Sequence, residues 1–243
     1  MKKIVGVIPA RWQSSRFPGK PLADILGKSL IQRTYENASR SKSLDALVIA
    51  TDDQRIFDHA QSFGAEIFMT SPACPAGTDR VWEVIEKHFP EAEIVVNIQG
   101  DEPCLDPEVV DRLVAKMRHL PESVLITPVA QILDPHLISS TRVVKCVFDK
   151  GGKALYFSRS PIPFAQNALL IHHYYRHLGI YCFRREALCQ YVLLEKTPLQ
   201  EREDLEQLKM LENGFPIHVC IVEDQAIGVD TPEDIKMVIN LLT

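Results

Sequence analysis

Short apolar runs alternate with segments of helical periodicity along the first half of the chain. The apolar runs are rich in β-branched residues and lack polar alternation, which is typical of strands buried on both faces; they cover residues 4–9, 47–51, 67–70 and 94–99. Between these runs, apolar side chains recur every three or four residues and predict helices over 30–38, 56–63 and 81–85. Repeated strand and helix predict a doubly wound α/β fold with a mostly parallel sheet.

The next predicted helix, over residues 107–119, carries its own start signal. Asp106 is a good N-cap residue, and Pro107 suits the first helical position because its fixed φ is already helical. Val110, Leu113 and Met117 then fall on one face of the helix. This segment therefore extends the α/β pattern of the first half.

The regular alternation loosens after about residue 121. Strand-like runs over 124–130, 142–149 and 154–164 are separated by turn residues, among them the Gly151–Gly152 pair. We therefore expect one domain, residues 1–243, in which 121–185 form a mixed β excursion. Regularity returns with a helix over 199–213, a strand over 217–222 and a last helix that begins at Pro232.

Composition narrows the class of protein further. The net charge is −5, so nothing favours nonspecific binding to nucleic acid or to an anionic membrane, and no apolar run reaches the length of a membrane span or a signal peptide. The six cysteines never occur at C-x-x-C spacing, which predicts reduced thiols and no zinc site. We expect a cytoplasmic globular protein that binds neither nucleic acid nor membrane.

The first candidate site is the loop that follows the first strand, within IPARWQSSRFPGKPL (residues 8–22). In an open parallel sheet, ligands bind beyond the carboxyl ends of the strands. This loop has one glycine, Gly19, so neither the dinucleotide-binding nor the ATPase glycine pattern fits. Arg11, Arg16 and Lys20 nevertheless supply three cations that could neutralise a triphosphate. A solvated basic loop is the alternative.

Two acidic stretches suggest a metal. VNIQGDEP (96–103) places Asp101 just after a strand, and GVDTPED (228–234) contains Asp230 before a helix that Thr231 can cap. Carboxylates together with substrate phosphates are the ligands that Mg²⁺ prefers. Asp101 could instead cap the next helix, but Asp106 already holds that place. Asp101 is therefore a candidate ligand of Mg²⁺, and Asp230, which has no evident capping task, could join it as a second ligand.

Five motifs in order resemble the 3-deoxy-manno-octulosonate cytidylyltransferases, also called CMP-KDO synthetases. They are IPARWQSSRFPGKPL, VNIQGDEP, ALYFSRSPIP, RHLGIY and GVDTPED, and they span residues 8–234. The resemblance implies the α/β fold of the nucleotide-diphospho-sugar transferases, with the excursion serving sugar binding and dimerisation. It also implies a homodimer that uses CTP and Mg²⁺ to convert KDO to CMP-KDO and pyrophosphate, for lipopolysaccharide biosynthesis. The S-R-F-P-G-K-P-L form differs from the loop of the related CMP-sialate synthetases.

The resemblance also implies roles for individual residues. It places Arg11, Arg16 and Lys20 on the CTP phosphates and Asp101 and Asp230 on Mg²⁺, as the catalytic set of an in-line phosphoryl transfer. It adds Arg80 and Gln99 near the nucleotide, and the sugar-side residues Arg159, His177, Tyr181, Glu206 and Gln207. His177 could instead be a structural histidine, and Glu206 and Gln207 could lie on the solvent-exposed face of a helix.

Two other classes of function stay open on the sequence alone. One is a cytidylyltransferase for a different acid sugar, an amino-KDO or a sialic acid, because residues 8–22 do not distinguish these substrates. The other is a nucleotide-binding sensor without catalysis. The joint presence of two acids and three cations argues against the sensor, since binding alone does not need the whole set.

Overall fold

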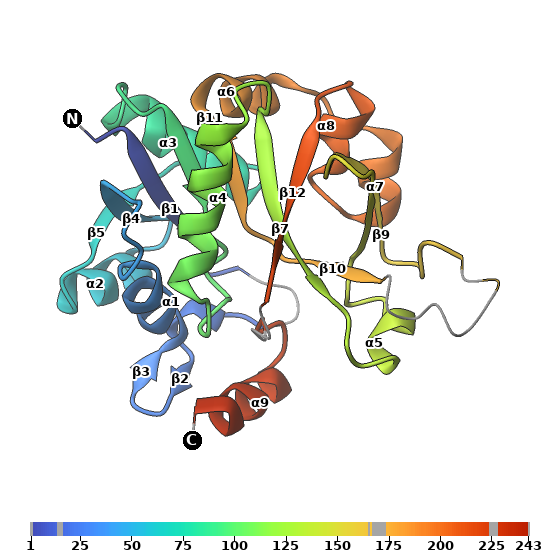
Figure 1. Ribbon diagram of the computed structural model, residues 1–243. Helices are drawn as coiled ribbons and strands as arrows, with labels where there is room; N and C mark the ends of the chain where they lie inside the picture. Colours follow the sequence, from blue (N-terminus) through green and yellow to red (C-terminus); the bar gives the residue numbers. More distant parts are fainter. Residues whose placement is uncertain (1, 14–16, 165, 167–173, 224–227, 243) are drawn as a thin grey trace. The chain divides into compact units, whose positions relative to one another are not determined.

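The chain folds into two compact units in a computed structural model that describes residues 2–13, 17–164, 166, 174–223 and 228–242. Unit 1 consists of residues 1–111 and 225–243, and unit 2 of residues 112–224 (Figure 1). Unit 2 is wider than the excursion expected over 121–185. No described helix has both the length and the apolar composition that crossing a membrane requires.

Unit 1 is built on a parallel sheet in the order β5-β4-β1-β6. These strands are β1 (Ile4–Ala10), β4 (Ala46–Thr51), β5 (Glu66–Met69) and β6 (Ile94–Asn97). All four lie at the runs predicted from the sequence. Nearly every side chain of β1, β4 and β6 is buried, because helices cover both faces of a doubly wound sheet.

The helices of unit 1 follow the predicted pattern. They are α1 (Leu30–Ala38), α2 (Gln54–Ser62), α3 (Gly77–His88) and α9 (Pro232–Leu242), with α4 (Pro107–His119) running across the unit boundary. The chain moves outward from β1 to β4 and β5, then returns to place β6 on the other side of β1. Right-handed crossovers therefore put α1 and α2 on one face and α3 on the other. The reversal between β1 and β6 is the position where such sheets bind ligands.

Helix caps account for several boundaries. Asp106 accepts a hydrogen bond at Oδ1 from the Glu108 N–H (2.9 Å), as its predicted capping role requires. Gly64 ends α2 with a φ of 80°, a left-handed conformation that glycine adopts without steric cost. At the start of α9, Asp234 Oδ2 accepts from the Thr231 N–H (2.8 Å), the reverse half of a capping box.

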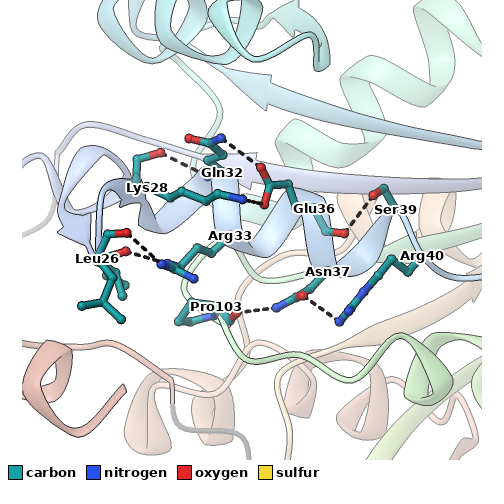
Figure 2. A network of polar contacts seen from close by, with 11 residues as sticks. Leu26, Lys28, Gln32, Arg33, Glu36, Asn37, Ser39, Arg40 and Pro103 are labelled. Atoms are coloured by element: carbon teal, nitrogen blue, oxygen red, sulfur yellow. Dashed lines mark hydrogen bonds and ion pairs between the residues drawn. The ribbon is translucent and has the colours of Figure 1, made fainter. Parts of the chain in front are cut away.

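A short hairpin and α1 form a polar network in unit 1. The hairpin pairs β2 (Asp24–Ile25) with β3 (Lys28–Ser29). The Arg33 side chain donates to the carbonyls of Ile25 (2.7 Å) and Leu26 (3.2 Å), which fixes the hairpin on the helix (Figure 2).

Unit 2 contains a mixed sheet. Its strands are β7 (Leu125–Gln131), β8 (Lys145–Phe148), β9 (Ala154–Ser158), β10 (Tyr175–His177), β11 (Tyr181–Arg184) and β12 (Ile217–Val222). The order is β11-β7-β10-β8-β9, and β12 pairs in parallel with β7. The other pairs are antiparallel, as a mixed β excursion predicts.

The helices of unit 2 correct one prediction. They are α5 (His136–Ser139), α6 (Arg185–Leu193), α7 (Pro198–Glu203) and α8 (Leu208–Glu212). The single helix predicted over 199–213 is wrong, because Asp204 adopts a left-handed φ of 52° and separates α7 from α8. A non-glycine residue in this conformation ends a helix.

Candidate active site

The loop after β1 turns at Gly19. Its φ is 72°, and its N–H donates to the carbonyl of Trp12 (3.0 Å). A Cβ at this position would lie 2.9 Å from Cη2 of the Trp12 ring, so both the backbone conformation and the space favour glycine. Lys20 and Pro21 then open the short 3₁₀ helix η1 (Lys20–Leu22), which directs the Lys20 side chain away from solvent.

Lys20 joins two loops that are remote in sequence. Its ammonium donates to Asp101 Oδ2 (2.6 Å) and to the carbonyl of Val229 (2.8 Å), and it lies 3.9 Å from Asp230 Oδ1. The Val229 N–H donates in turn to the carbonyl of Asp101 (2.9 Å). Lys20, Asp101 and Asp230 therefore meet within unit 1, and their roles at phosphate and metal stay predictions.

Main-chain contacts hold both acidic loops in place. Helix α1 anchors the first loop, because Thr34 Oγ1 donates to the Gly100 carbonyl (3.3 Å) and Asn37 Nδ2 to the Pro103 carbonyl (2.6 Å; Figure 2). Asp234 anchors the second by accepting from the Asp230 N–H (2.9 Å). The positions of both carboxylates are thus determined by the fold and not only by the contact with Lys20.

The two carboxylates fit a divalent cation. Both face one positive charge, the Lys20 ammonium, so their oxygens already converge on a cation. Within the described part of the chain, no cluster of three or more His, Cys, Asp or Glu residues could hold a metal by itself. Mg²⁺ tolerates this arrangement because it keeps water and substrate phosphate oxygens among its ligands.

The other residues predicted to bind the nucleotide differ in their position and exposure. Arg11 directly follows β1 and is exposed, Gln99 lies two residues beyond β6 and is partly exposed, and Arg16 is outside the described residues. Arg80 is 3% exposed, and its guanidinium donates to Asp52 Oδ2 (2.8 Å) and to Thr70 Oγ1. Arg80 therefore ties α3 to the ends of β4 and β5, and its role at the nucleotide stays a prediction.

In unit 2, Arg159 is held by main-chain carbonyls. Its Nε donates to Glu203 (2.7 Å), Nη1 to Thr141 (3.1 Å) and Nη2 to Asp204 (3.2 Å). These bonds use three of the five guanidinium N–H groups and orient the side chain, which is 35% exposed. The charge of Arg159 thus stays near the surface in a defined position.

His177 and Tyr181 belong to a row of aromatic rings. The His177 ring lies 5.0 Å from the ring of Phe157 and 5.5 Å from that of Tyr181, and its Nε2 bonds Thr127 Oγ1 (2.8 Å). His177 is half-buried, and the desolvation of its ring lowers the pKa of His177 to about 3, so the imidazole is neutral at pH 7. Burial, together with the Glu206 charge, raises the pKa of Tyr181 well above its usual value, so its hydroxyl stays protonated.

Gln207 completes this group. The Tyr181 hydroxyl donates to Gln207 Oε1 (3.0 Å), while Gln207 Nε2 is buried without a hydrogen-bond partner among the described residues. Gln207 is 2% exposed, so the alternative that it lies on a solvent-exposed helix face is wrong. A buried amide that lacks a partner is unfavourable by itself, and a ligand oxygen would satisfy it.

Sequence reasoning missed Lys145, the first residue of β8. It is fully buried, and its ammonium donates to the carbonyls of Ser140 (2.8 Å), Val143 (2.6 Å) and Arg159 (2.5 Å). Desolvation lowers its pKa. The signal available in the sequence was a lysine inside the apolar run VVKCVF, since a buried charge needs compensating partners.

Comparison with known proteins defines the class to which this fold and site belong. The chain belongs to the cytidylyltransferase family, because the family model described as "Cytidylyltransferase" matches residues 5–225.

Individual similar proteins have more specific names than the family. The 3-deoxy-manno-octulosonate cytidylyltransferase of Chlamydia pneumoniae is 59% identical over 240 residues, which cover 98% of this chain and 93% of that protein. A solved structure of CMP:2-keto-3-deoxy-manno-octonic acid synthetase complexed with CTP superposes with a TM-score of 0.92 at 41% identity, covering 99% of this chain and 98% of the other. The 4-diphosphocytidyl-2C-methyl-D-erythritol synthase of Anaerococcus prevotii shares the fold alone (TM-score 0.66, 18% identity, 99% and 98% covered). The resemblance stated from the five motifs is confirmed.

Proposed function

We propose that this chain transfers the cytidylyl group of CTP to 3-deoxy-manno-octulosonate and releases pyrophosphate. The relatives named above carry that activity in their names and match nearly the whole chain. The observation that carries the proposal is the meeting of Lys20 with Asp101 and Asp230 beyond the carboxyl ends of β1 and β6, where a doubly wound sheet binds its ligand.

The reaction is an in-line substitution at the α-phosphorus of CTP. The anomeric hydroxyl of the sugar forms the new P–O bond, the bond to the β,γ-diphosphate breaks, and the hydroxyl proton passes to solvent. Arg11, Arg16 and Lys20 bind the phosphates and stabilise the charge that develops on the leaving pyrophosphate. Gln99 and Arg80 complete the nucleotide side of this proposal.

Mg²⁺ is the metal that this proposal assigns to Asp101 and Asp230. When bound, it polarises phosphate oxygens and lowers the pKa of the attacking hydroxyl. The two aspartates hold and orient the cation, and the hydrogen bonds to their loops keep the carboxylates in place.

The sugar-side residues all belong to unit 2. Because His177 is neutral at pH 7, it serves the sugar as a hydrogen-bonding group, and Arg159 is the cation for the sugar carboxylate. Tyr181, Glu206 and Gln207 bind sugar hydroxyls. The buried Nε2 of Gln207 supports this role, since it has no partner among the described residues.

The proposal includes a cellular setting and an assembly. The product of this reaction is an activated acid sugar for lipopolysaccharide biosynthesis. All six cysteines are free thiols, which supports a reducing, cytoplasmic compartment. We also infer a homodimer, and light scattering on the purified protein measures its mass.

One experiment tests the reaction and the substrate together. CTP and Mg²⁺ are incubated with the protein and KDO, a sialic acid or no sugar, and pyrophosphate release and the phosphorus NMR spectrum are recorded. Release with KDO and a new phosphodiester signal are expected. Turnover with the sialic acid alone would assign another acid sugar, and tight CTP binding without any turnover would indicate a sensor.

A further inference from the structure

Arg55 stacks on Trp12 at the edge of the candidate nucleotide loop. The guanidinium carbon of Arg55, in the first turn of α2, lies 3.4 Å from the centroid of the Trp12 ring. Arg55 is exposed, yet its orientation is fixed, because Nε and Nη2 donate to the two carboxylate oxygens of Asp53 (2.9 and 2.6 Å). A planar guanidinium held in this way offers its face to an aromatic ring.

Asp53 is itself held by the fold. It is the N-cap of α2, and its Oδ1 accepts from the Arg55 N–H (3.0 Å). The chain Asp53–Arg55–Trp12 therefore begins at a helix terminus and ends at the indole, so the position of the ring is set by α2.

Trp12 links this chain to the residues proposed for the phosphates. It directly follows Arg11, its carbonyl accepts from the Gly19 N–H (3.0 Å), and its ring leaves no space for a Cβ at Gly19. Lys20 is the next residue. The main chain and the ring of Trp12 thus both contact Gly19, and Trp12 and Gly19 are the direct neighbours of two of the cations assigned to CTP.

We propose that Trp12 and Arg55 are positioning residues for CTP binding, which hold Arg11 and Lys20, the neighbours of Trp12 and Gly19, where they can reach the phosphates. This inference rests on the proposed function. Residues positioned before the ligand arrives lose less conformational entropy on binding, so the stack increases CTP affinity without touching CTP. Arg55 is not a phosphate ligand in this proposal, since Asp53 neutralises its charge.

The test uses kinetics on matched variants. Trp12→Ala is expected to raise KM for CTP about tenfold and Arg55→Ala about threefold, in line with an exposed cation–π contact, with KM for the sugar unchanged. Trp12→Phe keeps a ring and restores most of the loss. Arg40→Ala is the control, because Arg40 is an exposed arginine in the turn after α1, where its side chain donates to Asn37 Oδ1 (2.7 Å; Figure 2).

Asp53→Asn separates positioning from direct phosphate contact. Asparagine still caps α2 but no longer forms the ion pair that orients Arg55. Positioning predicts a higher KM for CTP in this variant. If Arg55 bound phosphate directly, removal of the competing carboxylate would lower that KM, and the proposal would be overturned.

Fluorescence supplies a readout besides activity. Trp12 and Trp82 are the two tryptophans, so Trp82→Phe leaves Trp12 as the reporter. Loss of the stack in Arg55→Ala should change the Trp12 emission before CTP is added. Unchanged emission, or KM for CTP within about twofold of the parent in both Trp12→Ala and Arg55→Ala (roughly the smallest effect that the contact predicts), would refute the positioning role. A parent that turns over CTP while the variants match it contradicts this inference alone, whereas a parent without CTP binding contradicts the proposed function as well.

Discussion

The Lys20 ammonium lies 2.6 Å from Asp101 Oδ2 and 3.9 Å from Asp230 Oδ1, so one lysine serves as counter-ion to both carboxylates proposed for Mg²⁺. A divalent cation at these carboxylates competes with the ammonium for the same oxygens. The triphosphate of CTP offers the ammonium a new partner. Metal and nucleotide should therefore bind cooperatively, because the metal replaces the ammonium at the carboxylates and the triphosphate pairs with the displaced ammonium.

Lys20→Met tests this competition. Without the ammonium, the two carboxylates repel each other and attract a cation more strongly, so Mg²⁺ should bind about tenfold more tightly when no nucleotide is present, a gain of about 1.4 kcal/mol. CTP turnover should fall about a hundredfold or more, because a phosphate ligand is lost. Isothermal titration calorimetry measures the metal affinity.

Lys28→Met is the control for that measurement. Lys28 also pairs with a carboxylate, Glu36 (2.6 Å), but in the network on α1 (Figure 2). It should leave Mg²⁺ affinity unchanged. Equal Mg²⁺ affinity in Lys20→Met and the unmodified protein would show that lysine and metal do not compete.

Asp101→Asn and Asp230→Asn test the metal site itself. Each substitution keeps the size of the side chain and removes one anionic ligand, so turnover in Mg²⁺ should fall by about a hundredfold to a thousandfold with the fold intact. Asp106→Asn lies on the same stretch of chain and should keep its activity, because asparagine is an equally good N-cap. Near-normal turnover of Asp101→Asn, with an unchanged circular dichroism spectrum, would show that Asp101 is not a ligand of the metal.

Much of the fold could be predicted because its signals are local. The strands of unit 1 are continuous apolar runs, and α4 covers the predicted residues 107–119, beginning directly after the predicted cap Asp106. The error at residues 199–213 has a non-local cause. The Glu203 carboxylate accepts from the Ser158 hydroxyl (2.6 Å) and the Arg159 N–H (2.9 Å), and the Asp204 carbonyl accepts from the Arg159 guanidinium. Contacts with a remote strand end the helix there, and apolar periodicity does not report them.

The candidate site also has features that the sequence predicts and features that it does not. Strand–loop order predicts that Lys20, Asp101 and Asp230 reach one edge of the sheet, because the carboxyl ends of parallel strands lie together. It does not predict that Lys20 bonds Asp101, which depends on the turn at Gly19. The sugar-side residues came from the resemblance alone. The buried network around Lys145 and Gln207 depends on side-chain packing across several strands.

Gly19→Ala and Gly27→Ala form a matched pair. Both glycines have a left-handed φ, 72° and 77°, so alanine adds a backbone strain of about 1 kcal/mol at either position. Only at Gly19 does the new methyl group meet Trp12, whereas nothing lies within 4 Å at Gly27. Gly19→Ala should therefore lower the free energy of unfolding in urea further and raise KM for CTP. If the two variants had equal stability and equal KM, the contact between Gly19 and Trp12 would have no energetic role.

The depressed pKa of His177 makes the stability of the protein depend on pH. The unfolded chain binds a proton near pH 6.5, while folded His177 stays neutral down to about pH 3. Below pH 6.5 the unfolded state therefore binds more protons, and stability falls as the pH is lowered, by at most about 1.4 kcal/mol per pH unit from this residue.

His177→Gln removes this titration and keeps a group that can bond Thr127. Between pH 7 and pH 5, the variant should lose about 2 kcal/mol less unfolding free energy than the unmodified protein, as measured in urea at each pH. His136→Gln, at an exposed position in α5, should follow the unmodified protein. Because every other titratable group is shared, the difference between the two pH profiles isolates His177. Parallel profiles for His177→Gln and the unmodified protein would mean that His177 is protonated in the folded state at mildly acidic pH, and Arg159 would then not be the only cation offered to the sugar carboxylate by the proposed sugar-side residues.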